Sequence, residues 1–328
     1  LYFGAFQTVL LLVSVYLLAR RIFRWKYSAL IALIFFSLFL NQGRFVASLP
    51  QETGMFAVTL CAYFLVSFLH TPLSKHTLER DGRVRRFFRI NQYFSRKYMT
   101  ADALLFMLSV SLCIAYHFYT AIAACLFVAA ILLAHIAKAV KKRYWVPVIL
   151  SGALGVLIAV VPFAASFATG TPFQESMNWA LTVIEGEEYQ GDNYQTNLES
   201  TLDSAAAQED GAAALAADTA AADVSPLAGL SIRDKLLFVY RALRDYLEVS
   251  LLGNTMTRIF VLCFAAGAAC SVLSLPFRKL RRYGADYAAM LIYTVMILIV
   301  GAAQTLHIME IIASSRAGTF IDPYLGIV

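Results

Sequence analysis

Two neighbouring polar residues lie where one long apolar block of this sequence gives way to the next. Gln51 and Glu52 follow Pro50, which ends a helix because it lacks a backbone N–H, and they precede another apolar block. A carboxylate beside an amide can bind substrate hydroxyls or act in acid–base chemistry. Solvation and N-capping of a helix end is the alternative interpretation.

A second group has the order Tyr116-His117-Phe118-Tyr119, between two apolar blocks. A histidine flanked by tyrosines can orient a phosphate or a sugar hydroxyl, and its charge responds to pH near neutrality. His117 and Tyr119 are therefore candidate substrate-binding residues. The alternative is that these aromatic residues mark a membrane interface, where amphipathic rings collect.

The third group comprises His307, Glu310 and Arg316, after the last complete apolar block. His307 and Glu310 are three residues apart and share a helix face, so they are weak candidates for a divalent metal ion. Two ligands do not make a metal site, and no metal site is assigned. Arg316 is the stronger candidate, because a guanidinium can hold a lipid phosphate through two parallel hydrogen bonds. An interfacial arginine that only extends its charge to water is the alternative.

Long apolar blocks position these residues. Apolar residues make up 60% of the chain and charged residues 15%, whereas soluble proteins have roughly 45–50% and 25%. A bilayer core of about 30 Å needs about 20 apolar residues per helix. We therefore expect an all-α, polytopic transmembrane bundle of about eight spans. The blocks cover residues 1–19, 27–46, 54–70, 103–117, 119–137, 145–168, 257–277 and 286–306, and a ninth begins near residue 320.

The distribution of charge predicts the orientation of the bundle. Four connecting segments, 20–26, 71–101, 138–143 and 278–282, hold 20 of the 27 Lys and Arg residues. All four fall on one side of the membrane only if residues 103–137 form a helical hairpin with its tip at 116–119. As one helix these residues would reach about 52 Å, too long for a single span. The positive-inside rule then places the basic segments in the cytoplasm of a multi-pass cell-membrane protein.

Three regions follow from this topology: spans 1–6 in residues 1–168, an extracytoplasmic loop in 169–256, and the remaining spans in 257–328. Residues 204–224 are rich in Ala and acidic residues, and we expect them to be disordered or weakly helical. Apolar residues recur at helical spacing from Ile232 onward, which predicts an amphipathic helix over 231–252 that lies flat at the membrane interface or packs against a soluble lobe. The acidic loop can also recruit a partner protein.

Several classes of function lose support. The five cysteines lie inside apolar blocks without metal-ligand spacing, and no motif for nucleotide binding or zinc proteolysis occurs. The net charge of +6 belongs to membrane-flanking segments, so it does not indicate nucleic-acid binding. The chain lacks an initiator Met and ends within a further apolar stretch, so we expect it to be a fragment of a longer protein.

The layout resembles the GT-C superfamily of membrane glycosyltransferases. Residues 48–56 (SLPQETGMF) are similar to the Pro and acidic residue that these enzymes place before a Phe-rich helix. Residues 315–324 (SRAGTFIDPY) resemble their late Arg-aromatic-Pro segment, and the helix expected at 231–252 resembles their juxtamembrane helices. The resemblance implies sugar transfer from a polyprenyl-phosphate carrier at the extracytoplasmic face. The family's usual catalytic carboxylate lies in a loop that would precede residue 1, so no catalytic residue is assigned.

Under this hypothesis Arg316 holds the carrier phosphate, while Glu52, His117, Gln51 and Tyr119 contact sugar or acceptor. A divalent metal cofactor is compatible with such a site. Two alternatives remain open. One is a transporter or lipid flippase. The scarcity of charged residues inside the spans argues against this alternative. The other is a non-enzymatic envelope protein.

Overall fold

The computed structural model describes residues 2–23, 25–39, 54–70, 100–136, 145–169, 231–277, 280–303, 305–306, 317–325 and 327–328. The regular elements among these residues are all helical, and no strand occurs in them. The predicted all-α fold is therefore confirmed for the described part of the chain. The predicted insert 204–224 lies outside it.

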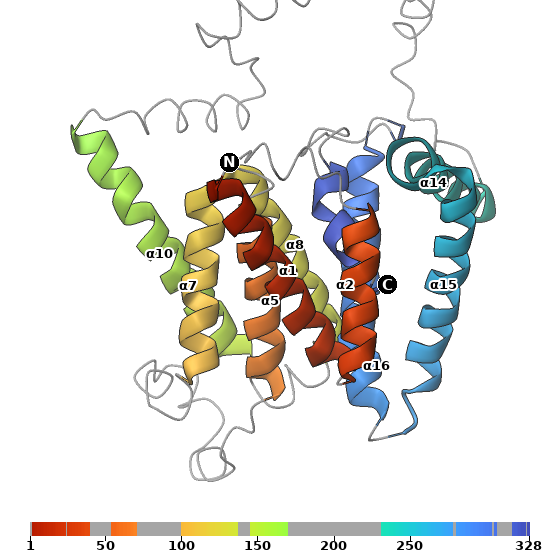
Figure 1. The fold of residues 1–328 in the computed structure, drawn as a ribbon, viewed down its shortest axis with the longest axis horizontal. Helices are drawn as coiled ribbons and strands as arrows, with labels where there is room; N and C mark the ends of the chain where they lie inside the picture. Colours follow the sequence, from red (N-terminus) through yellow and green to blue (C-terminus); the bar gives the residue numbers. More distant parts are fainter. Residues whose placement is uncertain are drawn as a thin grey trace, which may run out of the picture. The chain divides into compact units, whose positions relative to one another are not determined.

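Nine longer helices account for most of the described residues (Figure 1). The apolar blocks predict most of them, and the hairpin expected over 103–137 is present in its described part, since one helix ends at Tyr116 and the next begins at Phe118. The helices are α1 (Tyr2–Phe23), α2 (Lys26–Phe39), α5 (Met55–His70), α7 (Ala101–Tyr116), α8 (Phe118–Ala134), α10 (Trp145–Thr169), α14 (Ile232–Tyr246), α15 (Gly253–Leu273) and α16 (Leu280–Gly301).

Two buried hydroxyl groups, those of Thr59 and Ser109, bond to the backbone of their own helices. Thr59 donates to the carbonyl oxygen of Met55 at 2.8 Å. Ser109 donates to the carbonyl of Leu105 at 2.7 Å. Such bonds to a residue one turn earlier satisfy the hydroxyl without a partner from another helix, which suits an apolar environment.

The chain divides into two compact units, residues 1–161 with 239–328, and residues 162–238. In the first unit α5 packs against α1, α7 and α8, while α8 and α15 pack against α16. The helix ends that flank the four basic segments lie together in Figure 1, at the lower end of this unit. We call this end, with Phe23, His70, Ala134 and Leu280, the basic end. The opposite end holds Met55, Tyr116, Phe118 and Gly301.

Within the described ranges, three helices are long and apolar enough to cross a membrane, over Phe6–Phe23, Thr255–Leu273 and Tyr283–Gly301. Four more apolar helices are shorter: Met55–His70, Ala101–Tyr116, Phe118–Ala134 and Val146–Pro162. Only 17% of the Thr255–Leu273 stretch is buried, and Leu262 and Leu273 are exposed. An apolar helix left this open is unfavourable in water and compatible with a lipid environment.

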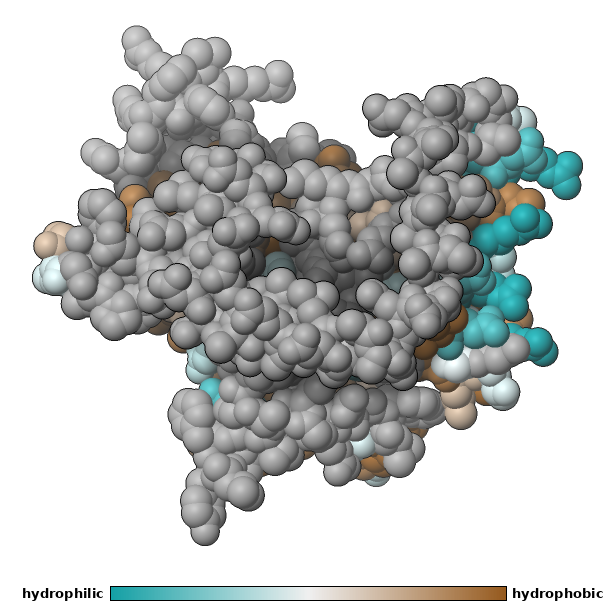
Figure 2. Space-filling model, turned by 90° about the horizontal axis from the view of Figure 1, so that it is seen from above, coloured by the Kyte–Doolittle hydropathy of each residue, from teal (hydrophilic) through white to brown (hydrophobic). Residues whose placement is uncertain are grey.

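The amphipathic helix predicted over 231–252 is present as α14, which a π-helical turn over Leu247–Leu252 continues. The right margin of Figure 2, where α14 lies, shows hydrophilic side chains beside hydrophobic ones. Within the first unit Tyr246 is buried and its ring lies against Gly301, where a Cβ atom would overlap it. The position of α14 at a membrane interface remains a prediction.

A short irregular segment is buried in the first unit. Residues Gly318–Phe320 and Asp322–Tyr324 form 3-10 turns, at the point where the sequence predicts the start of a ninth span. Tyr293 donates to the carbonyl of Phe320 at 2.9 Å, and the Tyr324 hydroxyl lies 2.9 Å from that of Thr59. The Phe127 ring meets the Tyr324 ring edge-to-face at a centroid distance of 5.2 Å and stacks on Tyr293 at 4.1 Å. These contacts fix the segment against α5, α8 and α16, and the ninth span remains a prediction.

Candidate functional site

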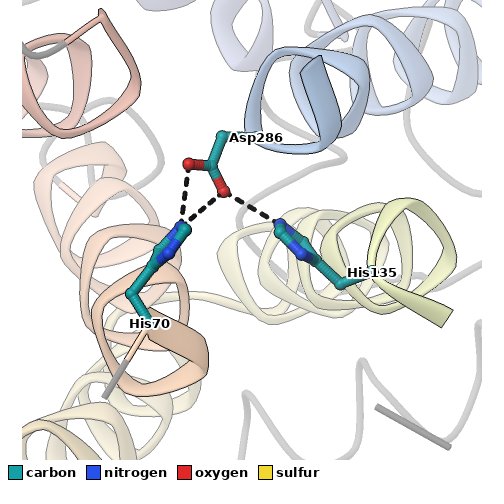
Figure 3. Close-up of side chains that lie close together, drawn as sticks. All are labelled: His70, His135 and Asp286. Atoms are coloured by element: carbon teal, nitrogen blue, oxygen red, sulfur yellow. Dashed lines mark hydrogen bonds and ion pairs between the residues drawn. The ribbon is translucent and has the colours of Figure 1, made fainter. Parts of the chain in front are cut away.

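A cluster of two histidines and one aspartate is buried at the basic end of the first unit (Figure 3). His70 is the last residue of α5, and His135 directly follows α8. Asp286 lies in the second turn of α16. Three helices therefore each supply one side chain, and the packing of α8 against both α5 and α16 brings them together.

The Asp286 carboxylate lies between the two imidazoles. His70 Nε2 is 2.8 Å from both Oδ1 and Oδ2 of Asp286, and His135 Nε2 is 2.9 Å from Oδ1. The two rings are 5.9 Å apart between centroids and almost perpendicular, at 88°. The side chains of His70, His135 and Asp286 are 2%, 4% and 3% exposed. The cluster is thus shielded from solvent.

This arrangement suits either a polar crosslink or a cation site. A buried carboxylate is costly unless hydrogen bonds or a cation compensate its charge. In the first case each Nε2–H donates to the carboxylate and the three helices are held together. In the second, both imidazoles turn an unprotonated Nε2 toward a metal ion that Asp286 also binds.

The sequence analysis did not single out these three residues. His70 closes the apolar block 54–70, His135 lies near the end of 119–137, and Asp286 opens 286–306. The predicted topology already puts these three block ends on one side of the membrane. A search for metal-ligating residues at block ends on the same side would have found them. Charged residues are scarce within the predicted spans, but Asp286, near the start of α16, is a buried carboxylate.

The predicted group at 116–119 forms the tip of the α7–α8 hairpin, at the opposite end. His117 caps α8, because its Nδ1 accepts a hydrogen bond from the backbone N–H of Tyr119 at 3.1 Å. The rings of His117 and Tyr119 are 5.1 Å apart, and both residues are half-buried. Tyr116 meets Phe56 of α5 edge-to-face at 5.5 Å. His117 thus has a local structural role, which leaves its predicted role in substrate binding untested.

The other candidate residues lie outside the described part of the chain: Gln51, Glu52, Arg316, His307 and Glu310. Their predicted roles stay predictions. The described residues next to them do have defined places. Residue 54 immediately precedes α5, and Ala317, which follows Arg316, is buried.

A cavity of about 640 Å³ lies between α1, α15 and α16, and neither His117 nor Tyr119, the described candidate residues, lines it. Its lining is mostly apolar, with Ser271, Ser274, Tyr283 and Tyr287 among the polar members. Among the described lining residues, hydroxyl and thiol groups are present but no charged side chain or imidazole is. The buried His–Asp–His cluster therefore remains the best-defined polar site among the described residues.

The comparisons with known proteins add no further constraint on either end of the bundle. No family model matches the chain, and neither a curated protein nor a solved structure matches it.

Proposed function

We propose that the chain is a multi-pass membrane glycosyltransferase that takes a sugar from a lipid-phosphate carrier at the end opposite the basic end. In this proposal eight helices cross the bilayer, namely α1, α2, α5, α7, α8, α10, α15 and α16. The basic segments are cytoplasmic and residues 169–256 are extracytoplasmic. Local thinning of the bilayer and tilting accommodate helices shorter or longer than the hydrocarbon core.

One observation carries the proposal: the contact between Phe56 and Tyr116. Their rings meet edge-to-face at 5.5 Å, so α5 begins beside the tip of the α7–α8 hairpin. Gln51 and Glu52 precede α5 in the sequence, and His117 forms the tip. Two groups of candidate residues, chosen from separate parts of the sequence, therefore flank helix ends that are in contact. A carboxylate and an imidazole together can bind sugar hydroxyls and exchange protons with them.

The segment after Arg316 gives a second support. The Tyr324 hydroxyl bonds to Thr59 in the second turn of α5, and Phe320 is completely buried. The chain that follows Arg316 is thereby anchored to the same helix that Gln51 and Glu52 precede. In the proposed site Arg316 holds the carrier phosphate, while Glu52, Gln51, His117 and Tyr119 contact sugar or acceptor. The catalytic group is not assigned.

The decisive experiment measures binding of a polyprenyl-phosphate analogue to the full-length protein in nanodiscs. Loss of a charge-assisted contact costs about 1.5–3 kcal/mol, so Arg316→Ala should weaken binding about ten- to a hundred-fold. Arg316→Lys should be nearly as poor, because a point charge lacks the planar fork of a guanidinium.

Arg258 supplies the matched control. It is an exposed arginine in the second turn of α15, toward the end of the bundle opposite the basic end. Arg258→Ala and Arg258→Lys should bind the analogue as the wild type does. Equal binding by wild type and both Arg316 variants would remove Arg316 from the site and with it the proposed carrier.

A further inference from the structure

We propose that His70, His135 and Asp286 form a binding site for a divalent first-row transition-metal ion, of which Zn²⁺ is the reference case. The site lies at the basic end of the bundle. It uses none of the residues assigned to sugar transfer, so it stands or falls independently of the proposed function.

The donor set selects the class of ion. Two imidazole nitrogens and one carboxylate oxygen suit Zn²⁺, Co²⁺ or Fe²⁺, whereas Mg²⁺ and Ca²⁺ prefer oxygen ligands alone. One ligand atom from each of the three residues lies within 4.8 Å of the others. In a tetrahedral site with metal–ligand distances of about 2.0–2.2 Å, neighbouring ligand atoms are separated by roughly 3.3 Å. The three donors are therefore already gathered at the scale of one ion.

Side-chain movement alone is needed to admit the ion. The nitrogen–oxygen contacts are now 2.8 and 2.9 Å and must open by about half an ångström, while the two Nε2 atoms, which lie within 4.8 Å of each other, must reach the same ligand spacing. His70 and His135 lie at the last described turns of α5 and α8, where a ring can shift without displacing a helix interior. Each imidazole must offer its Nε2 lone pair, so in the metal-bound form the ring proton resides on Nδ1.

The surroundings favour a specific site over a loose surface association. All three side chains are at most 4% exposed, and they come from α5, α8 and α16, which pack together. A metal ion would compensate the buried Asp286 carboxylate more fully than two neutral imidazoles can. Three protein ligands leave a fourth tetrahedral position for water or a small anion, as in zinc sites that are open to exchange.

The test uses the full-length protein in detergent micelles, stripped with a chelator and titrated with Co²⁺, whose tetrahedral complexes absorb visible light. We expect one Co²⁺ per chain with visible bands that Zn²⁺ abolishes by displacement. His135→Gln and Asp286→Asn should weaken Co²⁺ binding at least ten- to a hundred-fold, since even loss of a residue that only orients a ligand costs about that much. His117→Gln is the matched control, because His117 caps a helix at the opposite end and its loss should leave binding unchanged.

Wild-type protein that binds no stoichiometric Co²⁺ or Zn²⁺ would overturn the proposal and leave a metal-free hydrogen-bonded crosslink. So would folded variants that bind the ion as tightly as the wild type. If a variant fails to fold, X-ray absorption of the Zn²⁺-loaded wild type decides the question. Two imidazole ligands in its spectrum would support the site, and fewer than two would contradict it.

Discussion

The two ends of the bundle hold their histidines by different means. At the basic end, hydrogen bonds join Asp286 to His70, 216 residues away in the sequence, and to His135, 151 residues away. At the opposite end, His117 bonds to the backbone of Tyr119, two residues away. The first arrangement exists only when three helices are packed, whereas the second needs one turn of one helix.

The difference predicts how each end responds to mutation. A polar network buried between helices cannot recruit water when one member is lost, so the remaining groups are left without partners. A helix cap at a half-buried tip can be replaced by solvent at small cost. Stability should therefore depend strongly on the cluster and weakly on the tip.

The largest effect is expected for Asp286→Ala. This variant removes the carboxylate that accepts from both buried Nε2–H donors, at about 1–3 kcal/mol each, so we expect a loss of about 2–6 kcal/mol in the free energy of unfolding. The measurement is chemical unfolding of metal-free protein in detergent micelles, followed by circular dichroism. Asp286→Asn is the control, because its side-chain carbonyl still accepts one hydrogen bond, and it should lose clearly less. Equal stability of Asp286→Ala and wild type would show that the cluster does not hold the helices together.

How much the sequence reveals follows the same division between local and long-range features. The apolar blocks predict most of the helices, and the polar tip at Tyr116 and His117 predicts the hairpin, because hydrophobicity and helix ends are local properties. The cluster of His70, His135 and Asp286 depends on which helices become neighbours. A single sequence does not specify which helices become neighbours. The predicted topology limits the possible members of the cluster to residues on one side of the membrane. It does not identify which of those residues lie close together.

The 3-10 turns at 317–325 illustrate the same limit. Their apolar sequence indicates the beginning of another span, and nothing local signals that Tyr324 bonds to Thr59 or that Phe320 accepts from Tyr293. Local sequence thus does not reveal the tertiary contacts of the segment. The candidate roles of Glu52 and Arg316 rest on local sequence alone and remain predictions.

An intermediate effect is expected at the packing of α10 on α7, between the two ends. A Cβ atom on Gly155 would lie 2.6 Å from the carbonyl oxygen of Met107, and a backbone atom cannot move aside without shifting a helix. Gly155→Ala should therefore cost about 1–3 kcal/mol of stability through overpacking.

Gly152 in the same helix is the matched control, because a Cβ atom there meets nothing within 4 Å. Gly152→Ala should be neutral or slightly stabilising, since alanine favours helix. Unfolding curves of the two variants, recorded side by side in detergent micelles, provide the measurement. Similar unfolding curves for the two variants would contradict the close packing of Gly155 against the Met107 carbonyl oxygen.

The smallest effect is expected for His117, and it separates the structural role of this residue from the functional one. His117→Ala removes the acceptor for the Tyr119 N–H and should cost about 0.5–2 kcal/mol, as loss of a helix cap does. His117→Asn should restore stability, because Asn is among the best N-caps, but it cannot reproduce an imidazole that binds a sugar or exchanges protons. We therefore expect His117→Asn to unfold like the wild type and yet to be defective in sugar transfer from a polyprenyl-phosphate donor. An Asn variant with wild-type transfer would leave His117 as a cap alone, and the proposed site would then have to be built without the hairpin tip.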